Sequence, residues 1–356
     1  MQNTNFTIAV YPGDGIGIEI MATAEAVLKA AQSKVGGFSL SLDTYSAGAA
    51  HYQKYKEDIA AADFNAGGDA DAILLGAMGL PSVRYPDGTE IAPHLRMRTA
   101  YELYAGLRPV KTFANAPGPL GSPRAADIDM IIVRESTEGL FASLNGGSRV
   151  TETEASETMT LTRSVCERLF DQSFRLAQAR KAKGGKGEVT CVDKSNVFPA
   201  FAFFRRIFDE RAEAFPNIAR RYSYVDAMAL DMVRKPWDFD VLVMENMFGD
   251  IISDLGAGIV GSMGLAPCAE LGDRHGLFQP AHGSAPDIAG QGVANPTAMI
   301  LSWLGRQHDV PQCVEAASLI EAAVSQGFAD GTIRPHEFGG NTGTVEIGEA
   351  VVARMG

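Results

Sequence analysis

Two aspartates at helical spacing are the residues best suited to chemistry in this sequence. Asp250 and Asp254 lie in the segment 246–254 (NMFGDIISD), which follows a short apolar strand at 241–244. On a helix this spacing places both carboxylates on one face, and open α/β sheets present their sites where the strands end. Because hard divalent cations prefer oxygen ligands, the pair predicts a metal site. Helix capping by Asp250, with Asp254 in solvent, is the open alternative.

Three arginines could bind the anionic groups of a substrate that is held by such a metal. Arg98 and Arg108 lie in the segment 95–109 (LRMRTAYELYAGLRP), and Arg134 ends a strand-like segment at 130–133. The planar guanidinium donates two parallel hydrogen bonds to a carboxylate. A single arginine at a strand end is usually a surface charge. Three arginines that converge on a carboxylate pair would instead indicate a metal-bound polycarboxylate substrate.

The elements that must position these residues alternate along the chain. A strand at 6–10 runs through the turn 13–17 (GDGIG) into a helix at 18–31, and the turn departs from the dinucleotide-binding spacing, so we expect it to line a cleft rather than hold a pyrophosphate. Alternating strands and helices predict an α/β fold with parallel strands, and 356 residues suffice for two domains. The other strand-like segments are 38–45, 72–75, 130–133, 188–192, 222–225 and 241–244.

A threonine-rich segment interrupts this alternation. Residues 148–162 (SRVTETEASETMTLT) mix small β-branched residues with charges and are too polar to form a core of their own. An exposed edge ribbon of this length usually pairs with another strand. We therefore expect an arm that joins a dimer, with a solvated hairpin as the alternative.

Composition restricts the possible partners. With 43 acidic and 31 basic residues the formal net charge is −12, which disfavours binding to nucleic acid or to an anionic membrane surface. No apolar stretch approaches the length of a membrane span, and the N-terminal residues lack a secretion signal. The four cysteines are more than twenty residues apart, as expected in a reducing compartment. These features predict a cytoplasmic protein.

Five motifs in register resemble those of the β-decarboxylating dehydrogenases, the group that includes isocitrate, 3-isopropylmalate, homoisocitrate and tartrate/D-malate dehydrogenases. The resemblance runs from Gly13 to Gly340 and implies the two-domain isopropylmalate dehydrogenase-like fold, with parallel or mixed sheets and an intersubunit β arm. Domain one would comprise 1–103 and 261–356, and domain two 104–260. The motifs are 134–139 (RESTEG), 192–196 (VDKSN), 225–228 (VDAM), 246–254 (NMFGDIISD) and 282–290 (HGSAPDIAG) followed by 294–296 (ANP).

The resemblance also implies roles for the charged residues. Arg98, Arg108 and Arg134 would bind the carboxylates of a hydroxy-dicarboxylate substrate. Asp250 and Asp254, joined by Asp226 of the partner subunit, would hold Mg²⁺ or Mn²⁺. Lys194, also donated across a homodimer, would assist removal of the hydroxyl proton, so that the active sites would be shared.

For the cofactor, the resemblance implies NAD. The loop formed by His282, Gly283, Ser284 and Ala285 would bind the adenosine, while Asp287 would accept hydrogen bonds from the ribose hydroxyls. Because the charge of Asp287 would repel a 2′-phosphate, NAD is expected rather than NADP. In addition, Asn295 would face the adenine and Asn196 the nicotinamide side.

Some positions depart from the pattern of the family. Phe141 stands where the family has the tyrosine that protonates the enolate carbon, so water, Tyr104 or Ser143 would deliver the proton, or decarboxylation would be inefficient. Gln279 replaces a glutamate before the cofactor loop.

The substrate loop also departs from the pattern. His94 replaces one of an apolar pair of the isopropylmalate enzymes, and Arg96 adds a nearby cation. Burying an unpaired imidazole beside an isopropyl group would cost about 1–3 kcal/mol, so a polar C3 substituent fits better, unless these side chains face solvent and Leu95 faces the ligand.

These observations predict metal- and NAD-dependent oxidative decarboxylation of a C3-substituted (2R)-malate to a 2-keto acid. The alternative is a noncatalytic regulatory subunit of the same fold, which binds NAD or a dicarboxylate and for which Phe141 and Gln279 would be the signs of lost catalysis.

Overall fold

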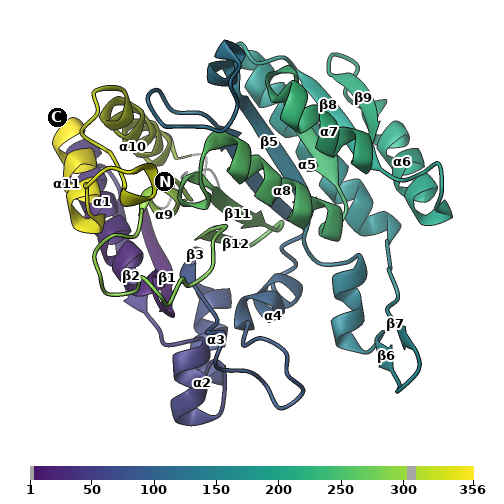
Figure 1. Ribbon diagram of the computed structural model, residues 1–356, viewed down its shortest axis with the longest axis horizontal. Helices are drawn as coiled ribbons and strands as arrows, with labels where there is room; N and C mark the ends of the chain where they lie inside the picture. Colours follow the sequence, from purple (N-terminus) through teal and green to yellow (C-terminus); the bar gives the residue numbers. More distant parts are fainter. Residues whose placement is uncertain (1–3, 303–309) are drawn as a thin grey trace.

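The computed structural model describes residues 4–302 and 310–356, and its strands form one large mixed sheet flanked by helices (Figure 1). The strand order is β2-β1-β3-β12-β11-β4-β5-β10-β8-β9. The α/β class is thereby confirmed. The strands are β1 (Asn5–Gly13), β2 (Ser39–Thr44), β3 (Ala72–Ala77), β4 (Ala105–Lys111), β5 (Asp129–Glu135), β8 (Glu188–Asp193), β9 (Ala219–Tyr224), β10 (Val241–Met244), β11 (Pro267–Leu271) and β12 (Gly276–Pro280).

Helices cover both faces of this sheet. Toward the β2 edge, α1, α10 and α11 pack together on one side, and toward the β9 edge α5 packs with α6 and α7 with α8. The helices are α1 (Gly17–Val35), α2 (Ala49–Tyr55), α3 (Ala61–Asp69), α4 (Pro93–Ala100), α5 (Arg163–Ala182), α6 (Pro199–Ala212), α7 (Val225–Arg234), α8 (Asn246–Val260), α9 (Thr297–Ser302), α10 (Pro311–Ala329) and α11 (Thr344–Arg354).

The interior strands β3 and β10 are apolar because both of their faces are buried. In β10, Val241 and Val243 pack in the cluster that holds α5 and α6, whereas Leu242 and Met244 pack in the cluster that holds α7 and α8. A strand covered on both faces reads as a continuous apolar run. This explains why 241–244 was predicted to the residue.

The centre of the sheet differs from the parallel arrangement predicted from alternation. β4 pairs antiparallel with both β5 and β11, and β11 pairs antiparallel with β12. Sequence inspection missed β4, β11 and β12, since glycine, proline and charged residues interrupt their apolar character. These central strands carry Arg108, Glu270 and Gln279, which are discussed below.

The predicted division into two domains has a counterpart in the hydrophobic cores. Two core clusters consist of residues between 104 and 260, whereas the others come from both ends of the chain together with Phe113. The sheet nevertheless runs without a break from β2 to β9. The boundaries at 103/104 and 260/261 therefore stay a prediction.

The threonine-rich segment forms a small hairpin. Its strands are β6 (Arg149–Val150) and β7 (Ala155–Ser156), and almost all of 148–162 is exposed, including Val150. The hairpin extends from the body of the molecule (Figure 1). A role as a dimer arm stays a prediction. Among the described residues, no helix has the length and apolarity needed to cross a bilayer.

Candidate active site

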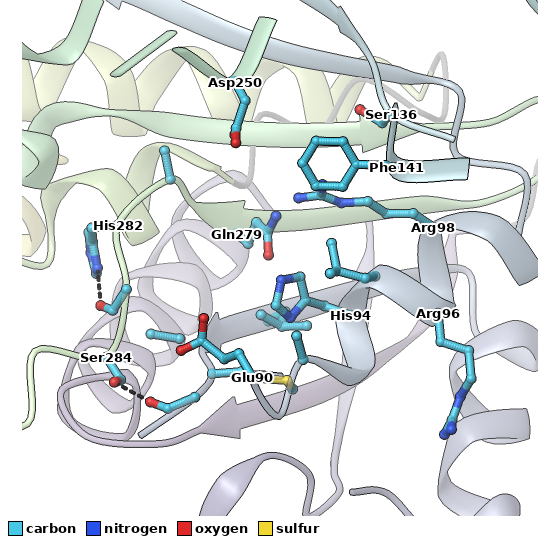
Figure 2. A pocket seen from close by; sticks show the side chains of 18 of the residues that line it. Glu90, His94, Arg96, Arg98, Ser136, Phe141, Asp250, Gln279, His282 and Ser284 are labelled. Atoms are coloured by element: carbon cyan, nitrogen blue, oxygen red, sulfur yellow. Dashed lines mark hydrogen bonds between the residues drawn. The ribbon is translucent and has the colours of Figure 1, made fainter. Parts of the chain in front are cut away.

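A cleft of about 1150 Å³ lies where the central strands meet α4, α8 and the loop after β12. Most of the side chains singled out in the sequence line it. Figure 2 shows several of them from close by. The predicted site residues along its wall are His94, Arg98, Arg108, Arg134, Phe141, Asp250, Asp254, His282, Gly283, Ser284 and Ala285.

The three arginines come from three different elements and form a buried cationic wall. Arg98 lies on α4, Arg108 on β4 and Arg134 on β5, and each is less than a tenth exposed. Arg134 Nε donates to Asn246 Oδ1 at 2.8 Å, and Nη1 pairs with Asp250. Burial and the two neighbouring guanidiniums lower the pKa of Arg134 to about 10. Such a concentration of positive charge favours an anionic ligand.

The carboxylate pair lies on α8, beside the arginine wall. Asp250 and Asp254 share one face of the helix, as predicted. The capping alternative for Asp250 is wrong, because Glu245 caps the helix by accepting from Met247 N at 3.1 Å and Phe248 N at 2.8 Å. Burial, and then the charge of Asp250, raise the pKa of Asp254. A cation between the two carboxylates would relieve this repulsion.

Close packing brings α8 against the arginine wall. A Cβ atom on Gly249 would lie 2.6 Å from Arg134 Cβ, so only glycine lets the helix approach β5 this closely. This contact places Asp250 beside Arg134. The glycine in the motif 246–254 thus has a packing reason.

Lys194, Asp226 and Asn196 are not part of this cleft. Lys194 Nζ lies 2.6 Å from Asp226 Oδ1, on the loop after β8 and the first turn of α7, and Asn196 is exposed nearby. No group of three metal-ligating side chains gathers anywhere in the described part of the chain. One chain therefore presents only two of the three predicted carboxylate ligands in the cleft.

The cofactor loop is held by the glycine-rich turn at 13–17. Ile16 N donates to Ser284 O at 2.8 Å, and a Cβ atom on Gly15 would lie 2.1 Å from that same oxygen. Gly15 also has φ +55°, which favours glycine. The turn supports the cofactor loop from beneath, but none of its residues lines the cleft, so the prediction that the turn lines it is wrong.

His282 has one ring nitrogen that is buried and unpartnered. Nδ1 lies 2.9 Å from Gly283 O, whereas Nε2 has no hydrogen-bond partner among the described residues. Burial lowers the pKa of His282, so the ring is neutral near pH 7. A buried ring nitrogen without a partner is suited to a ligand with a hydrogen-bonding group.

The other two residues predicted for adenosine lie further along the chain. Asp287 is exposed, and among the described residues only its backbone carbonyl is bonded, by the Gln291 side chain. Asn295 is buried and already bonded: Nδ2 donates to Glu337 Oε1 at 2.6 Å, and Oδ1 accepts from Thr297. The contact of Asn295 with an adenine stays a prediction. Glu337, which accepts the hydrogen bond from Asn295, would lie close to that contact.

The substrate loop places His94, Leu95 and Arg96 along the cleft. His94 points toward Gln279, while the Arg96 side chain lies farther from it (Figure 2). Arg96 pairs with Asp58 at 3.1 Å and is mostly exposed. Burial, and then the charge of Arg98, lower the pKa of His94 to about 3, so its ring is neutral, and its Nδ1 is buried without a partner in the described chain. The interpretation that both His94 and Arg96 face solvent is therefore wrong for His94.

Tyr104 and Ser143, the two side chains considered as the acid that protonates the enolate, do not face the cleft. Tyr104 donates its hydroxyl to Asp273 at 2.9 Å, and the Ser143 hydroxyl bonds Leu140 O at 2.6 Å and Glu157. Neither lines the cleft. Phe141 does line it, with its ring 5.1 Å from the Arg134 guanidinium. The proposals for Tyr104 and Ser143 are thus wrong on geometry.

Comparison with known proteins decides the family. The model of the isocitrate/isopropylmalate dehydrogenase family matches residues 7–351. The chain belongs to the isocitrate/isopropylmalate dehydrogenase family. Membership makes it an oxidoreductase, a decarboxylating dehydrogenase.

Individual relatives agree over the whole chain. It is 38% identical to the 3-isopropylmalate/3-methylmalate dehydrogenase of Methanocaldococcus jannaschii, with 98% of each covered, and 39% identical to the 3-isopropylmalate dehydrogenase of Pseudoalteromonas translucida, with both fully covered. The isocitrate dehydrogenase of Methylococcus capsulatus superposes with a TM-score of 0.85 at 33% identity, covering 98% of this chain and 99% of that one. These names favour catalysis over the noncatalytic alternative.

One residue of the site was missed in the sequence. Glu270, on β11, is fully buried and pairs with Arg98 and Arg108. It lies outside the family motifs, in a strand that was not predicted. A glutamate in the segment 267–271 (PCAEL) could have drawn attention, since charged residues are seldom fully buried unless paired.

Proposed function

We propose that this family member catalyses the NAD- and divalent-metal-dependent oxidative decarboxylation of a (2R)-malate that carries a polar substituent at C3, yielding a 2-keto acid. The observation that carries the proposal is one cleft that joins three buried arginines, a repelling carboxylate pair and the His282 loop. An anion, a cation and a nucleotide each find suitable groups there.

The arginine wall binds and orients the substrate. Arg98, Arg108 and Arg134 are buried and held by neighbours, so little side-chain entropy is lost when a carboxylate is bound. Guanidiniums that converge from α4, β4 and β5 can hold the two carboxylates of a malate while its C2 and C3 atoms face the open side of the cleft.

The residues fit the metal and the cofactor. Asp250 and Asp254 repel each other on one helix face, which suits a hard dication. When bound, Mg²⁺ or Mn²⁺ would supply Lewis-acid polarisation of the substrate oxygens, and NAD would accept the hydride. The unpartnered Nε2 of His282 and the exposed carboxylate of Asp287 provide polar groups for an adenosine without a 2′-phosphate.

The same proposal includes a homodimer with shared active sites. Lys194 and Asp226 lie outside the cleft of their own chain, beside apolar side chains that are more than half exposed. Exposed apolar side chains near a functional pair are typical of an interface. A partner subunit would bring Lys194 to the substrate hydroxyl, where its amine takes up the hydroxyl proton. The exposed apolar residues are Val197 and Phe198, in the turn after Lys194, and Leu230, on α7 with Asp226.

The substituent at C3 is proposed from His94. Its neutral ring faces the cleft with an unpartnered Nδ1. An apolar substituent would leave that nitrogen unpaired, at a cost of about 1–3 kcal/mol. A hydroxyl or similar group at C3 would satisfy it.

Turnover measurements test the proposal. We expect NADH to form from NAD, Mn²⁺ and at least one member of a panel of D-malate, the tartrates, isocitrate, homoisocitrate and 3-isopropylmalate, with release of CO₂. EDTA should abolish the reaction and added Mn²⁺ should restore it. Asp254→Asn should lower kcat/KM about 100-fold, while Asp273→Asn, outside the cleft, should not. Turnover that is indifferent to EDTA would refute the metal site.

A further inference from the structure

Among the described residues, the fully buried Glu270 is the one carboxylate on a strand of the sheet that pairs with the arginine wall. Its Oε1 lies 3.0 Å from Arg98 Nη2 and 3.6 Å from Arg108 Nη2. The Cys268 thiol donates to the same oxygen at 3.5 Å. Glu270 itself does not line the cleft, so it reaches a substrate only through the two guanidiniums.

The sheet makes room for this carboxylate at the expense of a side chain on the neighbouring strand. Gly106 on β4 faces Glu270 on β11, and a Cβ atom there would lie 2.7 Å from Glu270 Oε2 and equally close to the Ser136 hydroxyl. Apart from the neighbouring Ser136 hydroxyl, which helps to lower the pKa of Glu270, Oε2 has no hydrogen-bond partner among the described residues. Leaving a buried carboxylate oxygen without its full hydrogen bonds is costly. Stability is therefore a poor reason for a glutamate at this position.

Glu270 is ionised in the folded protein. Burial alone would raise its pKa, but the Arg98, Arg108 and Arg134 guanidiniums hold that pKa at about 2. Three positive charges and one negative charge thus leave the wall with two positive charges. Asp250 and Asp254 on α8 are left out of this sum, because a bound dication would balance their two negative charges.

Within the described part of this chain, no other side chain of the cleft adds an unbalanced positive charge for the substrate. The His94 ring is neutral, because burial and Arg98 lower its pKa to about 3, and Arg96, which also lines the cleft, is paired with Asp58. His94 can therefore donate or accept a hydrogen bond at the C3 substituent but does not balance a carboxylate there.

We propose that Glu270 sets the charge that this site accepts, so that the substrate is a malate dianion whose C3 substituent is uncharged and hydrogen-bonding, and tricarboxylates are rejected. The inference rests on the proposed function and narrows it. Glu270 is a positioning residue: it fixes the forks of Arg98 and Arg108 and lowers their attraction for a third carboxylate. A third substrate carboxylate would be buried in this site without a balancing positive charge, which costs free energy. The site therefore selects against tricarboxylates by leaving that carboxylate unpaired.

A substrate panel with the wild-type enzyme is the first arm of the test. With NAD and Mn²⁺, we expect kcat/KM for a tartrate, which carries a hydroxyl at C3, and for D-malate, the unsubstituted reference, to exceed that for isocitrate by at least tenfold. If isocitrate is the equal or better substrate, the inference is overturned while the proposed function stands. If none of these compounds yields NADH, the proposed function itself fails.

Two variants form the second arm. Glu270→Gln keeps the shape and the acceptor for the arginines but removes the charge, and Glu270→Ser also relieves the crowding at Gly106. Either should raise the isocitrate-to-D-malate ratio of kcat/KM at least tenfold, mainly through the KM for isocitrate. General loosening of the site would lower both activities and leave that ratio unchanged, which would overturn the inference.

Glu135→Gln is the matched control. Glu135 is also fully buried on a central strand, but its carboxylate accepts from Thr137 and Glu138 rather than from the arginines. The selectivity ratio should remain that of the wild type. The wild-type panel decides the inference even if both Glu270 variants fail to fold.

Discussion

The arginine wall and the Lys194–Asp226 pair are two charged regions of very different construction. The wall is less than a tenth exposed, drawn from three elements and anchored by Glu270 and Asn246. The Lys194–Asp226 pair lies on the surface, with Asp226 mostly exposed, and it contacts no residue of the wall. The arginine wall is assembled entirely from one chain. The Lys194–Asp226 pair, in contrast, lies apart from the other predicted site residues of its chain.

The difference shows which part of the proposed chemistry a single chain can perform. Anion binding needs preorganised donors, and the buried wall supplies them. Proton transfer needs a group within hydrogen-bond reach of the substrate, and Lys194 lies outside the cleft of its own chain. A second copy of the chain would have to complete the site.

Mixing two inactive variants gives the largest expected effect. Lys194→Met and Arg134→Met should each lose at least about 100-fold in activity, because one removes the base and the other an anion anchor. In mixed dimers, a Lys194→Met chain with an intact wall would meet a partner with an intact lysine. Half of the dimers would then hold one good site of two, so about a quarter of wild-type activity should return. The recovered activity is measured as NADH formation after the two variants are refolded together.

The control for this experiment is a mixture of the Arg134→Met and Arg98→Met variants. Both substitutions affect the wall, so the mixed dimers gain no intact site on either chain. If the Lys194→Met and Arg134→Met mixture stays as inactive as this control, the lysine acts within its own chain and the shared site is wrong.

The stability of the two regions should also differ. Arg98→Met takes away the closer partner of a fully buried carboxylate and should lower the free energy of unfolding by about 3 kcal/mol. Lys194→Met breaks an ion pair whose carboxylate is largely exposed, so no measurable change is expected. Urea unfolding of the two variants makes the comparison, and equal midpoints would show that Glu270 does not depend on Arg98.

Sequence reasoning placed the peripheral strands well and the centre poorly. The segments at 6–10, 72–75 and 241–244 were recognised because they are apolar runs bounded by turns. The segment 105–111 contains glycine, arginine and proline, and its strand character comes from pairing with two neighbours rather than from its own composition. Tertiary pairing of this kind leaves no local signal.

The candidate site shows the same division. Arg98, Arg108, Arg134, Asp250 and Asp254 were found through spacing and motifs, and the structure brings them into one cleft. Glu270 was missed because its significance depends on residues 162 and 172 positions away in the chain. Arg96 lines the cleft, as its position in the sequence suggested, but spacing alone does not show that it is paired with Asp58.

Among these predictions, Phe141→Tyr should give the smallest change. It tests the position near the arginine wall where this sequence has phenylalanine instead of the tyrosine of the family. Phe141 lines the cleft with its ring 5.1 Å from the Arg134 guanidinium, so a tyrosine hydroxyl would extend the ring at the edge of the substrate space. Tyr104 and Ser143 are bonded elsewhere, which leaves water as the acid considered for the wild type. An added phenol should raise the rate of CO₂ release by about tenfold or less, the low end of general acid catalysis. NADH and CO₂ should rise together.

Phe141→Leu separates the hydroxyl from the ring, because it removes the aromatic contact with Arg134 and adds no acid. It should release CO₂ no faster than the wild type. If Phe141→Tyr and Phe141→Leu behave alike, proton delivery does not limit the second half-reaction, and the water that replaces the family tyrosine is as effective as a phenol. A rise in Phe141→Tyr alone would show that the arginine wall is complete while the proton-transfer side of the site is not.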